Sequence, residues 1–318
     1  MVNPADVLVV IDAGAYYLFK DLCEVPNINK YIISPPSNRL LSLGYKLHTN
    51  KQIGKYLWLP CRDLWFDYQE IERLLPTNGY LLINSMAMSL PTMEFWKRLK
   101  HNNPTVKFAL ILVDSMHGQS KHMIEVKKRI KDFSWDLILS YDQKDCFEYG
   151  YRYIEFSYYS CYNNIIPSDR ESDLYYISSL KGREKILREI NKACSDNGVD
   201  HLFKLYSIWK KVDYCEMLRK PLPYAKVLAD VLATNCILEI LPEGQKAQSL
   251  RYLEALCYNK KLLSNNPDLK NIPFYDARYM RSFAHIEDID WEWVRRKEEV
   301  NYENRPDISS VALLNYLF

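Results

Sequence analysis

The chain has 318 residues, of which 48% are hydrophobic and 26% are charged, and its formal net charge is +2. This length predicts two domains of ordinary size, and the composition excludes a disordered chain. The nearly balanced charge argues against a dedicated nucleic-acid-binding protein, which would present a strongly basic face.

Short apolar runs alternate with helical patterns through the first half of the chain. Runs of this kind are typical of buried strands, and amphipathic segments between them are typical of helices that pack on a sheet. The alternation predicts a parallel sheet with helices on both faces. The expected strands are 7–11, 31–34, 80–83, 107–113 and 136–139, with one helix through Leu99 and another that carries Met123, Val126 and Ile130 on one face.

The pattern breaks at residues 163–172, where Asn163-Asn164, Pro167 and a charged stretch interrupt it. We place the domain boundary there, between domains 1–165 and 166–318. The alternation then restarts, so the second half is a further Rossmann-like unit, and ligands of such sheets bind at the carboxyl ends of the strands. Strands are expected at 174–177, 202–206, 236–241 and 261–264, and helices through Cys194 and at 224–232 and 248–257.

The cysteines and the apolar runs bear on the compartment. None of the eight cysteines forms a Cys-x-x-Cys pair, and Cys236 and Cys257 fall inside apolar periodic segments. This usage favours cysteine as a small apolar side chain in a reducing compartment over disulfides or zinc sites. No stretch has a signal-peptide pattern or the roughly 18–20 apolar residues that span a bilayer. These features predict a cytoplasmic protein.

The most informative segment runs from Cys236 to Asn266. An apolar strand there ends in Pro242-Glu-Gly-Gln245, and a helix follows. Gly244 permits a tight turn, and the free amide groups after it suit a diphosphate. On the helix, Arg251 and Glu254 share a face, where a guanidinium can bind phosphate and a carboxylate can accept hydrogen bonds from ribose hydroxyls. The alternative is an exposed ion pair that contributes only a few tenths of a kcal/mol.

This segment resembles the C-terminal signature of bacterial GT-B glycosyltransferases of lipopolysaccharide and capsule synthesis. That signature is a strand ending in an acidic residue, then Gly-Gln, a small residue, Leu-Thr-x-Arg, x-x-Glu-Ala-Leu and Lys-Lys-Leu-Ile-x-x-Asn. The chain departs from it at Ala247-Gln-Ser249, where the family often has Gly-Leu-Thr, so a hydroxyl is kept and a glycine is lost. It matches at Glu239, Gly244, Gln245, Leu250, Arg251, Glu254, Ala255, Leu256, Lys260, Lys261, Leu262 and Asn265.

Three other segments resemble the same family, so the likeness covers about residues 106–275. Val113-Asp-Ser115 is similar to its aromatic-Asp-Ser strand end, and residues 135–145 are similar to its Phe-Asp-x-Val-x-Ser-Phe-Asp-x-x-Asp run. Asn271 to Tyr275 matches a downstream Asn-x-x-Phe-Tyr. The resemblance implies an α/β, GT-B-like fold, in which two Rossmann-like domains turn their parallel sheets toward a central cleft.

The resemblance also implies that the second domain binds a nucleotide-diphosphate sugar as donor substrate. Glu254 would contact the ribose, Arg251 the diphosphate, and Gln245 with Ser249 the phosphate or the sugar. Two basic residues in the turn after the domain's first strand are further phosphate candidates, although they also fit an ordinary basic helix start. The expected donor-binding residues are Lys181, Arg183, Glu243, Gly244, Gln245, Ser249, Arg251 and Glu254.

The catalytic base is expected after a strand of the first domain. An inverting transferase needs a carboxylate or histidine near the acceptor hydroxyl, whereas a retaining one mainly stabilises an oxocarbenium-like state and the leaving diphosphate. The candidates are Asp114, Asp12 and His117. Asp114 ranks first because it follows the strongest strand and fits the motif, although an aspartate that caps a loop is as common. Asp12 could instead position the acceptor.

No metal or organic cofactor is expected. Asp288-Ile-Asp290 spells the Asp-x-Asp of metal-dependent GT-A enzymes, but it lies late in the chain and fits surface acids. The histidines have no metal-ligand spacing, and neither a Gly-x-Gly-x-x-Gly fingerprint nor a phosphate-binding Gly-Lys-Ser/Thr loop occurs.

The end of the chain carries aromatic and apolar side chains that look exposed. They lie in Asp290-Trp-Glu-Trp-Val294 and in a helix expected over 307–317. In GT-B proteins a terminal helix often packs back on the first domain. The alternative is peripheral contact with the inner membrane near a lipid-linked acceptor.

The sequence therefore predicts a metal-independent glycosyltransferase. It would move a sugar from a nucleotide-diphosphate donor to a surface glycan, or a lipid-linked glycan, of lipopolysaccharide, capsule or exopolysaccharide, without a nucleic-acid partner. Two alternatives stay open: a catalytically silent GT-B-like protein that binds a nucleotide or glycan as a partner subunit, and an epimerase-like enzyme of the same fold.

Overall fold

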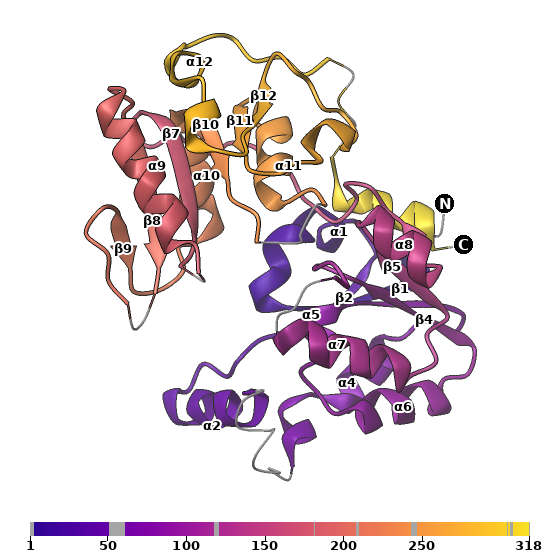
Figure 1. Ribbon diagram of the computed structural model, residues 1–318. Coiled ribbons are helices and arrows are strands. Elements are labelled where there is room, and N and C mark those ends of the chain that lie inside the picture. Colours follow the sequence, from indigo (N-terminus) through magenta and orange to yellow (C-terminus); the bar gives the residue numbers. More distant parts are fainter. Residues whose placement is uncertain are drawn as a thin grey trace. The chain divides into compact units, whose positions relative to one another are not determined.

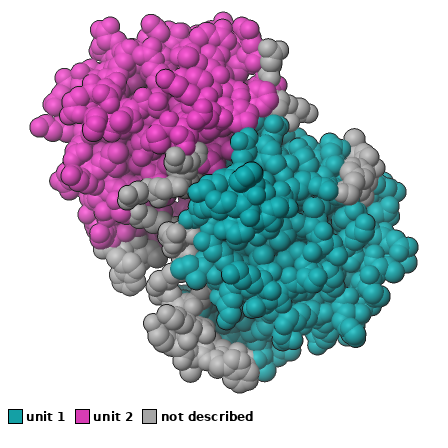
Figure 2. Space-filling view, turned by 45° about the vertical axis from the view of Figure 1, so that its right-hand side comes forward, with its two compact units in different colours: residues 1–160, 308–318 teal, residues 161–307 magenta. Residues whose placement is uncertain are grey.

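The computed structural model describes residues 3–50, 61–117, 121–180, 182–207, 210–242, 247–303, 305 and 308–317. The chain forms two compact units, residues 1–160 with 308–318 and residues 161–307 (Figure 2). The boundary that the sequence suggests, at 165/166, lies slightly later along the chain. Among the described residues, no helix is long and apolar enough to cross a membrane.

The first unit contains a parallel sheet of six described strands in the order β2-β1-β3-β4-β5-β6 (Figure 1). The chain runs from β1 to β2 in one direction and then returns past β1 to β3. The connections after β1 and β3 therefore diverge, which makes their carboxyl ends the topological switch point where ligands of open α/β sheets bind. The strands are β1 Val7–Asp12, β2 Asn29–Ile33, β3 Gly79–Asn84, β4 Val106–Ile111, β5 Leu137–Ser140 and β6 Arg152–Tyr153.

One face of this sheet forms the main core of the first unit. Leu8 and Val10 of β1, with their neighbours on β3 and β4, pack in one cluster with apolar residues of α4, α6 and α7. Trp96 of α6 is fully buried there, and its Nε1 donates to the carbonyl oxygen of Met88 over 3.0 Å. The helices of this unit are α1 Lys20–Cys23, α2 Arg39–Thr49, α4 Tyr68–Leu74, α5 Ser85–Met88, α6 Met93–Asn102, α7 Lys121–Lys131 and α8 Gln143–Tyr149.

The second unit has the strand order β12-β11-β10-β7-β8-β9, again all parallel within the described residues. β8 and β9 lie on one side of β7, and β10, β11 and β12 lie on the other, as in dinucleotide-binding Rossmann domains. The switch point lies between β7 and β10. The strands are β7 Ser172–Ser179, β8 His201–Tyr206, β9 Glu216–Leu218, β10 Thr234–Glu239, β11 Lys261–Ser264 and β12 Met280–Ser282.

Helices cover both faces of the second sheet (Figure 1). Leu187 and Ile190 of α9 and Trp293 of α12 share a core cluster with alternate residues of the strands. On the other face, the Tyr175 hydroxyl donates to Asp230 of α10 over 3.3 Å. The helices are α9 Glu184–Asp196, α10 Tyr224–Ala233, α11 Leu250–Cys257 and α12 Trp291–Arg295.

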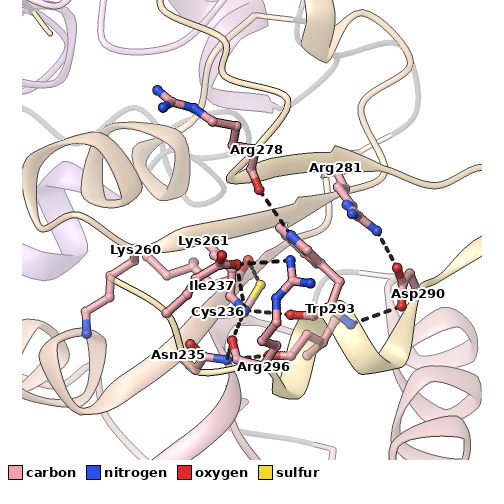
Figure 3. Close-up of polar contacts among 12 residues, drawn as sticks. Asn235, Cys236, Ile237, Lys260, Lys261, Arg278, Arg281, Asp290, Trp293 and Arg296 are labelled. Atoms are coloured by element: carbon pink, nitrogen blue, oxygen red, sulfur yellow. Dashed lines mark hydrogen bonds and ion pairs between the residues drawn. The ribbon is translucent and has the colours of Figure 1, made fainter. Parts of the chain in front are cut away.

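The expectation that the tryptophans near residue 292 are exposed is wrong for Trp293. Its side chain is buried, and its Nε1 donates to the carbonyl oxygen of Arg278 over 3.1 Å. The buried ammonium of Lys261 donates to the carbonyl oxygens of Trp293 (2.5 Å) and Arg296, which fastens this segment to the amino end of β11 (Figure 3). Trp293 therefore belongs to the core of the second unit, although charged residues surround it in the sequence.

The α-helix expected over 307–317 is a 3-10 helix, η6 Ser310–Tyr316, and residue 307 lies outside the described part of the chain. Leu313 and Leu314 are buried, and residues 308–318 group with the first unit. The Ser310 Oγ accepts from the Leu22 backbone N–H over 3.0 Å. Part of the apolar face of this segment, including Ile308 and Leu314, is thus used inside the chain, while Val311 and Ala312 are half-buried.

The expectation that no cysteine forms a disulfide is wrong for one pair. Cys161 and Cys257, which are 96 residues apart, are joined by a disulfide. The other six cysteines are free. The same connection is reinforced by the Tyr162 backbone N–H, which donates to the Tyr258 hydroxyl over 2.8 Å. Sequence spacing could not reveal the pair, because only the folded second unit brings the start of its chain to the end of α11.

We predict that Gly79→Ala destabilises the first unit. A Cβ at this first residue of β3 would lie 2.1 Å from the backbone oxygen of Asp6, so the strand would have to move. The expected loss is about 2 kcal/mol or more, measured by denaturant unfolding. Gly150→Ala is the matched control: nothing lies within 4 Å of its Cβ position, and its φ of +71° leaves backbone strain of roughly 1 kcal/mol. Equal losses in the two variants would contradict the steric explanation.

Candidate functional site

The candidate donor site lies at the carboxyl ends of β7 and β10, the switch point of the second unit. Ser249 is the N-cap of α11, and its Oγ accepts from the Arg251 backbone N–H over 3.0 Å. The Ser249 hydroxyl also donates to Glu239, the last residue of β10, so the start of α11 lies at the carboxyl end of that strand. The expected site residues Lys181, Glu243, Gly244 and Gln245 lie outside the described residues.

Glu239, the last residue of β10, organises the loop ends around it. Its side chain is fully buried and accepts hydrogen bonds from the hydroxyls of Ser249 and Ser264. Burial raises the pKa of Glu239, and the two hydroxyls and Arg251 act in the opposite direction. This carboxyl thus connects the end of β10 with the start of α11 and the end of β11.

Glu254 and Arg251 form an ion pair in which the carboxylate is buried and the guanidinium half-buried, contrary to the alternative of an exposed surface pair. Glu254 is 0% exposed and Arg251 15% exposed in their side chains. The second oxygen of Glu254 accepts from the Tyr224 hydroxyl over 2.9 Å. Burial raises the pKa of Glu254, while Arg251 and Tyr224 act to lower it. Burying a carboxylate is costly, so this pair is a specific feature of the site and not a chance surface contact.

Arg183 brings a second guanidinium to the same end of the sheet. It stands just before α9, and its Nη1 donates to the carbonyl oxygen of Ser179 over 3.4 Å. Its Nε is buried and makes no hydrogen bond with any described residue. Burial raises the pKa of Tyr176, and Arg183 and Arg251 both oppose that rise, so both guanidinium groups are within electrostatic reach of one hydroxyl. Two arginines near a switch point suit a diphosphate.

In the first unit, Asp12 ends β1 at the other switch point. It is 9% exposed, and its Oδ1 accepts from Nδ2 of Asn84, the last residue of β3, over 3.0 Å. Burial raises the pKa of Asp12, and Asn84 and the backbone N–H groups of Gly14 and Ala15 act to lower it. A Cβ at Gly14 would lie 2.9 Å from the Asp12 carboxylate, so a larger residue there would displace that side chain.

Asp114 is exposed, and the buried groups of this region are its neighbours. Ser115 Oγ donates to Asp142 over 2.5 Å, and Asp142 also caps α8 by accepting from the Lys144 backbone N–H over 2.9 Å. The loop after β4 is thereby held against the start of α8.

His117 stands beside two acidic side chains of α8. Its Nε2 lies 3.5 Å from Asp145 Oδ1 and 3.5 Å from Glu148 Oε2. Asp145 is fully buried; its Oδ2 accepts from the Met116 backbone N–H over 2.8 Å, while its Oδ1 accepts no hydrogen bond from the described residues. Burial, more than any other cause, raises the pKa of Asp145 to about 6. The structure thus pairs a partly exposed histidine with a buried carboxyl.

The sequence identified His117 but not its acidic neighbours as site residues. Asp145 is the final aspartate of the motif-like run 135–145, and Glu148 follows it by three residues on α8. The signal was present in that motif, but its burial was not visible without the fold. Asn84 and Tyr224 gave no signal, since each acts through a neighbour that is distant in sequence.

The Asp-x-Asp sequence has structural roles. Asp288 accepts from the His285 backbone N–H over 2.9 Å, and Asp290 caps α12 and pairs with Arg281 over 2.6 Å. Both side chains are exposed. Among the residues that the structure describes, no group of three or more His, Cys, Asp or Glu side chains could hold a metal ion.

No protein-family model matches this sequence, and no curated protein matches it either. Solved structures do. A UDP-forming alpha,alpha-trehalose-phosphate synthase from Burkholderia xenovorans is similar with a TM-score of 0.51 at 9% identity over 88% of each chain. A UDP-GlcNAc 2-epimerase from Neisseria meningitidis, bound to UDP-GlcNAc, has a TM-score of 0.47 at 9% identity over 98% of each chain. The first likeness confirms a GT-B-like α/β fold of two Rossmann-like units, and at this identity it shows the fold alone.

We predict that Asp145→Asn changes how stability depends on pH. The folded-state pKa, about 6, lies above the ordinary 3.8, so the protonated carboxyl favours folding. That contribution is complete below about pH 4 and is lost as the pH rises through 6. The asparagine variant should therefore gain stability relative to the original chain between pH 5 and pH 8, by about 1–3 kcal/mol.

Thermal unfolding of the variant and the original chain at pH 5 and at pH 8 measures this difference in stability. Asp132→Asn, an exposed change in the same unit, is the control and should show no comparable gain. A difference between Asp145→Asn and the original chain that does not vary with pH would contradict the prediction.

Proposed function

We propose that this protein is a glycosyltransferase that uses a nucleotide-diphosphate sugar as donor. The observation that carries the proposal is the Arg251–Glu254 pair, with its buried carboxylate, at the switch point of the second unit. Its position and residue types match the donor motif that the sequence resembles. The GT-B-like fold is consistent with this assignment.

The chemistry assigned to this site is donor binding and stabilisation of the leaving group. When the bond between the sugar and the diphosphate breaks, negative charge grows on the diphosphate. Arg251 and Arg183 would stabilise that charge, and the amides at the start of α11 would add to it. Glu254 would accept hydrogen bonds from the ribose, since each carboxylate oxygen has a second lone pair beside the one that faces Tyr224 or Arg251.

For the acceptor side, we propose His117 as the general base of an inverting reaction. A base must be accessible and held in orientation, and His117 is 24% exposed with Asp145 beside its Nε2. Asp145 would be a positioning residue. Asp12 and Asp114 are the competing assignments, the first because it ends β1 at the switch point and the second because it follows β4.

The acceptor is proposed to be a surface glycan or a lipid-linked glycan of lipopolysaccharide, capsule or exopolysaccharide. This part rests on the resemblance of residues 106–275 to bacterial GT-B enzymes of those pathways. We also propose that the reaction needs no metal ion. Two guanidinium groups can neutralise the charge on the diphosphate, which in metal-dependent GT-A enzymes is the task of a cation. A cytoplasmic location fits a nucleotide-sugar donor.

We predict that one of the uridine, guanosine, cytidine and thymidine diphosphates binds the protein in calorimetric titrations. Arg251→Gln should weaken that binding by about 1–3 kcal/mol, because a charged hydrogen bond to the diphosphate is lost. Glu254→Gln should weaken nucleotide binding by a similar amount. Arg73→Gln is the matched control, since Arg73 pairs with Glu70 at the same i,i+3 spacing but is 69% exposed.

The outcome also separates the alternatives. If none of the four nucleoside diphosphates binds, the glycosyltransferase proposal is contradicted. Binding without transfer to any glycan acceptor would favour a catalytically silent partner subunit, and interconversion of the free nucleotide sugar would favour an epimerase-like enzyme.

We predict that His117→Gln lowers kcat by about 100-fold or more while the nucleotide affinity is unchanged, because removal of a general base affects only the transfer step. Asp145→Asn should lower kcat less, since it orients the histidine without touching the acceptor. Steady-state kinetics with calorimetry provide the two readouts. A larger fall in kcat for Asp12→Asn or Asp114→Asn would reassign the base to that residue.

A further inference from the structure

Helix α2 carries an exposed stripe of leucines. Leu40, Leu43 and Leu47 are 80%, 58% and 44% exposed. Their spacing of three and four residues places them on one side of the helix. We call these three residues the leucine stripe. Scattered exposed leucines are ordinary, but three on one helix face form a continuous apolar surface.

On the other side of α2, Leu41 is 53% exposed, while Tyr45 and His48 anchor the helix to the first unit. Tyr45 is buried, and its ring meets Trp65 edge-on with centroids 6.0 Å apart. The Trp65 Nε1 donates to His48 Nδ1 over 2.7 Å. Gly44 permits this approach, because a Cβ there would lie 3.1 Å from the Trp65 ring. Trp65 thus packs against one face of α2, and the leucine stripe lies on another face.

Basic side chains flank the stripe. Arg39 and Lys46 are exposed, and they lie four residues before and three residues after Leu43 on the same helix. The surrounding sequence has the same character: from Val25 to Arg62 it contains six lysines and arginines and no aspartate or glutamate. The whole chain has 42 basic and 40 acidic residues, so this charge separation is local.

We propose that the leucine stripe, with Arg39 and Lys46, docks on the surface of an anionic lipid bilayer. An amphipathic helix binds there by inserting its apolar face at the headgroup boundary while basic side chains attract anionic lipids. A second copy of the chain fits less well, because a symmetric contact through the stripe would bring the basic side chains of one copy close to those of the other. The proposal does not depend on the proposed activity, and it assigns membrane contact to α2 in place of the buried C-terminal segment.

The test is co-sedimentation of the full chain with phosphatidylcholine vesicles, with and without phosphatidylglycerol. Binding should require phosphatidylglycerol and weaken as salt is added, because the electrostatic attraction is screened. The triple variant Leu40→Gln/Leu43→Gln/Leu47→Gln should bind at least about tenfold more weakly. Arg39→Gln/Lys46→Gln should bind about tenfold more weakly to the anionic vesicles.

Two controls distinguish an effect of the leucine stripe on vesicle binding from an effect of any exposed apolar side chain and from unfolding of the variant. Ile124→Gln and Ile166→Gln remove apolar side chains that are 57% and 84% exposed elsewhere, and they should bind like the original chain. All variants should keep their thermal unfolding transitions, because the changed side chains are exposed. Nucleotide titration of the leucine variant reports on the donor site separately and should be unchanged.

Three results would overturn the proposal. The first is vesicle binding of the leucine variant that equals that of the original chain, and the second is no binding of the original chain to either vesicle. The third is a dimer in sedimentation velocity that the leucine substitutions convert to a monomer, which would show that a second copy covers the stripe.

Discussion

Both units bury acidic side chains at the carboxyl end of a parallel sheet, and the architecture of both candidate sites depends on how these groups are satisfied. A carboxyl removed from water must gain hydrogen bonds or a cation, or take up a proton. Glu239 draws Ser249 and Ser264 toward the end of β10, and Glu254 draws Arg251 and Tyr224 toward α11. The loop ends and the start of the helix are therefore held in place before any ligand arrives.

The buried carboxyl groups differ in how many of their oxygens receive hydrogen bonds from the protein. Both oxygens of Glu254 have donors from the protein, so its charge is stabilised by Arg251 and Tyr224. One oxygen of Asp145 has donors, while the other has His117 at 3.5 Å. A carboxyl with hydrogen-bond donors on one oxygen only responds to pH and to the charge of its neighbour, so among the described residues Asp145 and His117 form a candidate acid–base pair. The two candidate sites therefore suit different tasks, binding in one and proton transfer in the other.

The sequence predicted local features well and long-range ones poorly. The strands around Val7, Leu110 and Ile237 and the helix with Arg251 and Glu254 were recognisable because apolar periodicity is a local property. The Cys161–Cys257 disulfide, the burial of Trp293 and the partnership of Asn84 with Asp12 join residues that are far apart in the chain. Motif resemblance extended the local signal as far as Asp145, but burial and the neighbouring His117 became visible only with the fold.

The contrast between α2 and η6 shows that an amphipathic pattern predicts a face that must be covered but not what covers it. Both segments carry apolar residues at helical spacing, and the sequence singled out the C-terminal one for membrane contact. In the structure Leu313 and Leu314 of η6 are buried inside the first unit, whereas Leu40 and Leu43 of α2 remain exposed. Apolar periodicity requires only that one face be covered, because exposed apolar area is unfavourable in water. Among the described residues, the chain itself provides that cover for η6 and provides only Trp65 and its neighbours, on the opposite face, for α2. In the described part of the chain the leucine stripe of α2 stays exposed, and the basic residues beside it favour an anionic surface over a second copy of the same helix.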